Sequence, residues 1–273
     1  MGILNQEQIN KFREKMCSDT STLGKLYRDR KSDGFSRSIN HNQVSEFEKN
    51  GWEILAELKT KTRMGKKKPF SVKFEDEIWC QLYELGFRDL NRDENLHLNF
   101  GSSELDKKQI DVLAIKDDIA LIVECKSSEK IKKAPSYKDD FDLLPKRIKG
   151  FKESLDQIYS KNFNVKYILA TKNLRVNVDG NDMKRFNKTK SFLHDNNSYK
   201  YVNYLIEKYK GASQYQFLGL VFNGELVNDQ KIEIPALSGN MGGFEYYMFS
   251  IEPEKLLKMG FILHRVIANR EEM

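Results

Sequence analysis

Three side chains in the middle of the chain have the types and the spacing for metal-dependent hydrolysis. Asp111 begins one apolar segment, residues 111–115, and Glu124 and Lys126 end the next one, residues 121–126. Because the side chains of a strand alternate between its two faces, Glu124 and Lys126 share a face. The polar stretch between the two segments predicts a hairpin turn, which would bring Asp111 to the same patch.

Two carboxylates and one ammonium group are what a magnesium-dependent phosphodiester hydrolase needs. Mg²⁺ prefers carboxylate, carbonyl and water oxygens, so we expect Asp111 and Glu124 to hold it, with the backbone carbonyl of Cys125 as a neutral ligand and Mn²⁺ as a substitute. The ion would lower the pKa of a bound water, and Lys126 would orient that water or stabilise the growing charge. The competing interpretation is a structural salt bridge between Glu124 and a nearby lysine.

The apolar periodicity around these residues predicts an α/β fold. Apolar residues recur at three- and four-residue spacing over 71–85 and again over 143–159, which favours a helix at each place, and 165–171 is a compact apolar strand. The order is helix, strand, strand, helix, strand. It indicates a mixed central sheet flanked by helices, with additional N-terminal and C-terminal α+β segments.

Changes in composition predict four consecutive segments. Residues 1–70 should hold helices at 6–16 and 44–51, a strand at 52–62, and a basic linker ending at Pro69. A polar loop should follow Lys126 as far as Pro135. The expected division is an N-terminal segment at 1–70, the core at 71–180, a helical connector at 181–230 and a small β-rich segment at 231–273.

Composition excludes several classes of protein. No run approaches the roughly 18 apolar residues of a membrane span, and the amino terminus lacks a secretory pattern. The three cysteines and four histidines are scattered, so neither a disulfide framework nor a zinc site is expected. We therefore expect a cytoplasmic protein without a membrane partner.

Clusters of lysine flank the acidic centre and favour DNA as the partner. The net charge of +6 is a weak signal by itself, because 40 acidic residues oppose 46 basic ones. The clustering of the cations along the chain is a stronger signal than the net charge. The alternative for any single run of lysines is an ordinary solvated surface. The cations that we expect to contact nucleic acid are Lys66, Lys67, Lys68, Lys130, Lys132 and Lys133.

The motif as a whole resembles a nuclease family. Asp111, twelve intervening residues and Glu124-Cys125-Lys126, preceded by Phe74-Glu75 on an amphipathic helix, resemble the PD-(D/E)xK enzymes, which are restriction-endonuclease-like and here closest to the Mrr-like branch. The resemblance covers residues 70–175. It implies a restriction-endonuclease-like core and an active site of four residues, namely Glu75, Asp111, Glu124 and Lys126. The family pattern alone selects Glu75, because the acids beside it equally suit a helix start.

A second resemblance concerns the C-terminal part. Segments 215–219, 234–237 and 249–253 are similar to the opening of DndB-like DGQHR-domain proteins, although the Asp-Gly-Gln-His-Arg string is absent. That group is associated with DNA modification and defence in bacteria. The similarity implies a role beside such a system.

These observations lead to three hypotheses about function. The first is a Mg²⁺-dependent DNA endonuclease in bacterial restriction or anti-phage defence, acting as a homodimer or within a larger defence complex. The second is a non-catalytic DNA-binding regulator of a DNA-modification system. The third keeps the nuclease but makes RNA or branched DNA the substrate.

Overall fold

The computed structural model describes residues 4–92, 95–103, 105–177 and 179–222, together with the strands at 237–241 and 244–248. The chain divides into two compact units, residues 1–200 and residues 201–273. This division falls earlier than the boundary expected near residue 230. The site residues named above all belong to the first unit.

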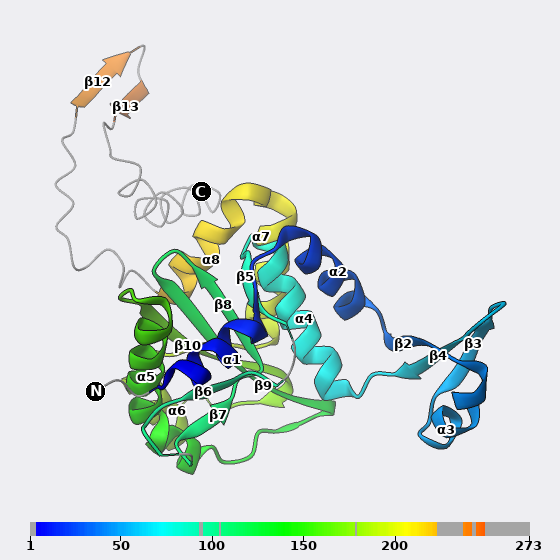
Figure 1. The fold of residues 1–273 in the computed structure, drawn as a ribbon. Helices are drawn as coiled ribbons and strands as arrows, with labels where there is room; N and C mark the ends of the chain where they lie inside the picture. The colour runs from blue at the N-terminus through cyan, green and yellow to red at the C-terminus, as the bar shows by residue number, and fades with distance from the viewer. Residues whose placement is uncertain are drawn as a thin grey trace. The chain divides into compact units, whose positions relative to one another are not determined.

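A mixed sheet of six strands forms the centre of the first unit (Figure 1). Its first three pairings are antiparallel, and its last two are parallel. Helices flank the sheet, so the α/β class and the mixed central sheet are confirmed. In spatial order the strands are β1 (Met16–Cys17), β5 (Asp89–Asn91), β8 (Val112–Lys116), β9 (Ile119–Lys133), β10 (Asn164–Arg175) and β11 (Phe192–His194).

The predicted hairpin is the antiparallel pair β8–β9. Its turn passes through Asp117, whose φ of 51° lies in the left-handed region that short polar residues tolerate. The predicted loop after Lys126 is wrong, because β9 continues to Lys133 and pairs with β10 along this extension. That part of β9 is exposed and polar beyond Ser128, so it lacks the apolar alternation that marks a half-buried strand.

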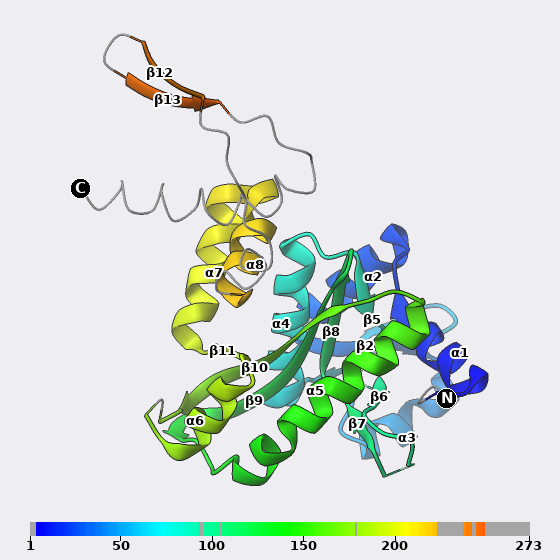
Figure 2. The ribbon, with the colours of Figure 1, turned by 90° about the vertical axis from the view of Figure 1, so that its left-hand side faces the viewer.

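Two long helices cover opposite faces of this sheet (Figure 2). α4 (Phe70–Glu84) packs on β8 and β9, and α5 (Lys138–Tyr159) packs on β10 from the other side. Both helices were predicted, and α5 begins five residues before the expected start at 143. α1 (Gln6–Lys15) confirms the first predicted helix, and α2 (Thr20–Lys31) packs against α4.

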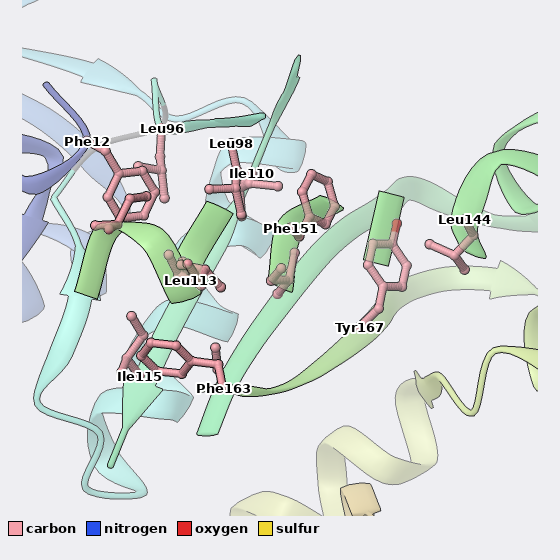
Figure 3. Close-up of a cluster of buried hydrophobic side chains, with 14 of the residues drawn as sticks. Phe12, Leu96, Leu98, Ile110, Leu113, Ile115, Leu144, Phe151, Phe163 and Tyr167 are labelled. Atoms are coloured by element: carbon pink, nitrogen blue, oxygen red, sulfur yellow. The ribbon is translucent and has the colours of Figure 1, made fainter. Parts of the chain in front are cut away.

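The main hydrophobic core fills the space between the sheet and α5 (Figure 3). Leu113 of β8 and Tyr167 of β10 extend toward Phe151 of α5, which is fully buried. α5 can approach the backbone of Phe100 closely because residue 150 is glycine. A Cβ at that position would lie 2.2 Å from the carbonyl oxygen of Phe100. The hairpin that ends near Phe100 consists of β6 (His97–Asn99) and β7 (Lys107–Gln109).

Residues 34–67, between α2 and α4, form a small antiparallel sheet that we call the arm (Figure 1). Its strands lie in the order β2, β4, β3. The prediction of a basic linker ending at Pro69 is wrong, because residues 62–67 of that stretch form the strand β4. Thr62 and Met64 are buried while Arg63 between them is exposed, an alternation that the surrounding lysines mask in the sequence. The elements are β2 (Gly34–Ile39), η1 (His41–Gln43), α3 (Val44–Lys49), β3 (Glu53–Glu57) and β4 (Thr62–Lys67).

The remaining elements follow β10. In the described part of the chain, four helices lie in the stretch where the helical connector is expected: α6 (Asn181–Lys188), α7 (Asn196–Tyr209), η2 (Lys210–Ala212) and α8 (Ser213–Phe222). β12 (Leu237–Met241) and β13 (Phe244–Met248) form an antiparallel pair in the second unit. The other residues of the C-terminal resemblance, 234–236 and 249–253, lie outside the described residues. Among the helices described, none combines the length and apolar character that crossing a membrane requires.

Candidate active site

Asp111 immediately precedes β8, and it lies close to Glu124 of the neighbouring strand β9. Val112 of β8 pairs with Val123 of β9, and continuing this antiparallel register by one residue places Asp111 across from Glu124. Directly opposed residues point to the same face, with Cβ atoms about 4.5–5.5 Å apart. Lys126 points to that face as well, two residues further along β9. The structure therefore brings these three predicted side chains together, on the α5 face of the sheet where the apolar core ends.

Hydrogen bonds from two neighbouring strands hold Asp111 in place. The backbone N–H of Cys125 donates to its Oδ2 at 2.7 Å. The side chain of Asn91 donates to the carbonyl of Asp111 at 3.1 Å and accepts from the N–H of Leu113 at 3.0 Å. Asn91 is itself buried and accepts at its carbonyl from the indole of Trp79 at 2.8 Å. The carboxylate is thus positioned by buried groups of β9, β5 and α4.

Glu124 is buried and carries two ion pairs. Lys126 Nζ lies 2.6 Å from Glu124 Oε1, and Lys108 Nζ of β7 lies 2.9 Å from Oε2. A buried carboxylate is costly unless it is paired in this way. The salt bridge that competes with the catalytic interpretation is therefore present, and it involves the predicted catalytic lysine itself.

The surroundings of Asp111 disfavour its negative charge. Burial, followed by the negative charge of Glu124, raises the pKa of its carboxyl group to about 6. The N–H of Cys125 and the two lysines act against this shift but do not cancel it. A divalent cation between Asp111 and Glu124 would remove the repulsion, so this pair fits such an ion.

Lys126 keeps its proton at neutral pH. Burial by itself would lower the pKa of its ammonium group, but the charge and hydrogen bond of Glu124, followed by the charges of Asp111 and Asp140, raise it above the ordinary value. The side chain is therefore a hydrogen-bond donor and a positive charge. In this state it can orient an anion or a water but cannot accept a proton.

Glu75 does not join this pair as a third carboxylate. It lies on α4, which covers the face opposite to the one that Glu124 shares with Asp111, and its charge helps to raise the pKa of the Cys125 thiol, after burial and Asp111. Among the described residues there is no group of three or more His, Cys, Asp and Glu side chains that could hold a metal. A catalytic role for Glu75 stays a prediction from the family pattern.

The donor set suits Mg²⁺ better than a softer ion. Asp111 and Glu124 offer hard carboxylate oxygens, and the backbone carbonyl of Cys125 is the neutral oxygen expected from the sequence. Mg²⁺ in enzymes is commonly held by one or two carboxylates and keeps several waters or substrate oxygens. The thiol of Cys125 is no competitor, because burial raises its pKa well above the ordinary value and keeps it protonated.

Sequence reasoning missed two charged residues of the site. Lys108 comes from the β6–β7 hairpin, and Asp140 from the first turn of α5, where Arg147 binds it at 2.9 Å. Although burial opposes ionisation, this bond and the charges of Lys108, Arg147 and Lys126 lower the pKa of Asp140. The only available signal was that Lys108 lies three residues before Asp111, which does not indicate where the hairpin packs.

Five of the six predicted nucleic-acid contacts lie in two exposed places. Lys66 and Lys67 are exposed on β4 of the arm, and Lys66 Nζ donates to the carbonyl of Asn50 at 2.8 Å. The downstream cations are exposed on the end of β9. They are Lys130, Lys132 and Lys133.

Lys68 is a correction to that prediction, because the fold buries it. Its ammonium group lies 2.8 Å from Asp76, which also binds Arg30 at 2.5 Å, and it donates to the carbonyls of Asp29 and Arg30. We call Arg30, Lys68 and Asp76 the buried ion triad. It joins the end of the arm to α2 and α4, so Lys68 has a structural role and cannot contact DNA.

Comparison with known proteins assigns no family to this chain. No family model and no curated protein matches it. Among solved structures, it is similar to a protein described as VC1899 from Vibrio cholerae, with 12% sequence identity and a TM-score of 0.36. The match covers 77% of this chain and 58% of that chain.

Proposed function

We propose that this chain is a Mg²⁺-dependent endonuclease of the PD-(D/E)xK type, with a restriction-endonuclease-like core. It hydrolyses phosphodiester bonds in DNA, in a bacterial restriction or anti-phage system. The observation that carries the proposal is the cross-strand pair of Asp111 and Glu124 with Lys126 on the same face. The hairpin register and the ion pair between Lys126 and Glu124 support this grouping.

Each residue has a distinct task in this proposal. Asp111 and Glu124 hold the cation, which when bound lowers the pKa of a water and offsets charge on the phosphate. Lys126, which stays protonated, donates to the attacking water or to a phosphate oxygen. Asn91 and the N–H of Cys125 keep Asp111 in position throughout.

DNA is favoured as the substrate by the exposed lysines on either side of the site in sequence. Lys66 and Lys67 on the arm and the lysines at the end of β9 present charge to solvent, as non-specific phosphate contacts require. We expect Lys66→Ala and Lys67→Ala each to reduce the salt slope of DNA binding by about 1, uniformly across sequences. The matched control is Lys149→Ala, a lysine of α5 that is also exposed.

The direct test is cleavage of plasmid DNA with Mg²⁺ or Mn²⁺, in several states of DNA modification. We expect Asp111→Ala and Lys126→Ala to abolish cleavage. Glu129→Ala, which removes an exposed carboxylate from the same strand, should leave it unchanged. Cleavage that survives both site substitutions, or no cleavage of any DNA, refutes the proposal.

A binding-only regulator is the second candidate, and the ion pairs of Glu124 favour it. Two lysines already satisfy this carboxylate, so it needs no metal to be stable where it lies. A regulator predicts salt-sensitive DNA binding that does not depend on metal and is unchanged by Glu124→Gln.

Cleavage assays on duplex DNA, single-stranded DNA, branched DNA and RNA decide whether the proposed nuclease prefers another nucleic acid.

A further inference from the structure

Two buried hydroxyl groups on the α5 face of the sheet have no hydrogen-bond partner among the described residues. They are Thr171 Oγ1 and Tyr137 Oη. We call them the hydroxyl pair. Buried polar groups are normally hydrogen-bonded, so two buried hydroxyls without a partner on the same face of the sheet need an explanation.

Thr171 faces the same side of the sheet as the candidate active site. β9 and β10 are parallel, and their register pairs Lys126 with Thr171 and Glu124 with Leu169. Paired residues on neighbouring strands share a face, so Thr171 stands beside Lys126. Its side chain is only 2% exposed, which leaves its hydroxyl out of reach of bulk water.

Tyr137 approaches the same centre from the start of α5. It is the residue immediately before the helix, its ring lies against Phe141 with 5.4 Å between centroids, and it is 7% exposed. Burial raises the pKa of its hydroxyl, and the charged groups that act on it are Lys126, Asp140 and Glu124. Tyr137 also belongs to the hydrophobic core between the sheet and α5, which lies on the same face of the sheet as the candidate active site.

The chemistry of the surroundings identifies the missing partner as an anion. A hydroxyl left unpaired in the interior destabilises the fold unless a ligand satisfies it in the working state. Glu124 is already bound by two lysines, and Lys126 has three N–H groups, of which one meets Glu124. A group with several acceptor oxygens fits three donors that lie on one face of the sheet.

We propose that Tyr137, Thr171 and Lys126 form a clamp for the non-bridging oxygens of the phosphodiester that is cut. This inference rests on the proposed function and adds the groups that recognise the phosphate. Both hydroxyls donate, and the phosphate oxygens accept. The bonds strengthen as negative charge grows on those oxygens during attack, so the clamp lowers the barrier and does more than bind the substrate.

Tyr137→Phe and Thr171→Val test the clamp, because each removes a hydroxyl and nearly keeps the shape. We expect kcat/KM for DNA cleavage to fall about 10- to 100-fold for each, mainly through kcat. The melting temperature should stay the same or rise, because the lost group had no partner. The matched control is Tyr159→Phe at the other end of α5, whose hydroxyl binds Asp89 and which should cleave normally.

If the two hydroxyls have only a structural role, their removal should change the melting temperature and not the rate of cleavage. A lower melting temperature with cleavage close to that of the wild type would overturn the clamp. An unchanged kcat/KM in both variants would overturn it as well. These outcomes require an active wild type.

A second measurement separates this inference from the proposed function. Inorganic phosphate should raise the melting temperature of the wild-type chain, as a ligand of the folded state does, and should have no effect on the Tyr137→Phe/Thr171→Val double variant. If the wild type cuts no nucleic acid but shows this difference, the nuclease proposal fails and the anion site stands. Equal protection of both chains, or of neither, overturns the anion site.

Discussion

Asp111→Asn should make the protein more stable while destroying its proposed activity. The substitution keeps the size of the side chain, and the amide oxygen can still accept the N–H of Cys125. It removes the negative charge that burial and Glu124 disfavour. Residues kept for function at the expense of stability behave in this way.

The magnitude follows from the pKa of Asp111. Folding raises it from 3.8 to about 6, and each pKa unit corresponds to about 1.4 kcal/mol, so the charged form costs about 3 kcal/mol in the folded state. Because folding raises the pKa, the protonated carboxyl group contributes fully to the stability of the folded state below pH 4. This contribution is lost as the pH rises through 6. The asparagine variant carries no such dependence.

Urea unfolding from pH 4 to pH 8 without divalent ions measures the effect. We expect the variant and the wild type to differ little at pH 4, and the variant to be more stable by about 2 to 3 kcal/mol at pH 8. Other titrating groups, such as Asp89, are common to both chains and cancel in the difference. Adding Mn²⁺ should stabilise only the wild type.

Two results would refute this reasoning. A difference that is the same at every pH would mean that Asp111 has an ordinary pKa. A variant less stable than the wild type at pH 8 would mean that the carboxylate is net stabilising. In a Glu124→Gln background the gain at pH 8 should shrink, because part of the shift comes from that charge.

Three further predictions concern the scaffold, each measured by denaturant unfolding. Asp76→Asn should lower the unfolding free energy by about 3–5 kcal/mol, because it leaves two buried cations of the ion triad without their acid; a loss below 1 kcal/mol would contradict this. Gly150→Ala should destabilise the protein despite its better helix propensity, since its Cβ would overlap Phe100, and a gain in stability would contradict the close approach. Burial lowers the pKa of His194 to about 4, so stability present above pH 6.5 should fall by about 3 kcal/mol as the pH drops toward 4; His194→Gln should abolish this loss, and an unchanged acid dependence would count against it.

Local patterns were enough to place the central elements. The runs at 111–115 and 121–126 are apolar enough to be buried on both faces of a sheet. The polar stretch between them is short enough for a hairpin turn, so the hairpin was predictable. The apolar periods of α4 and α5 are long enough to outweigh local ambiguity. Where polar residues dominate, in β4 and in the extension of β9 beyond Lys126, the apolar pattern was masked, and β4 and this extension were not predicted.

What the sequence by itself determined is the hairpin that brings Asp111, just before β8, to Glu124 and Lys126 of β9, because alternation and a short turn depend only on neighbours along the chain. The tertiary structure decided which distant groups surround them. It brought Lys108 to Glu124, buried Lys68 against Asp76 and left Glu75 outside the carboxylate pair. Those contacts depend on how helices and hairpins pack against the sheet, and packing is a property of surfaces that residues far apart in the chain build together.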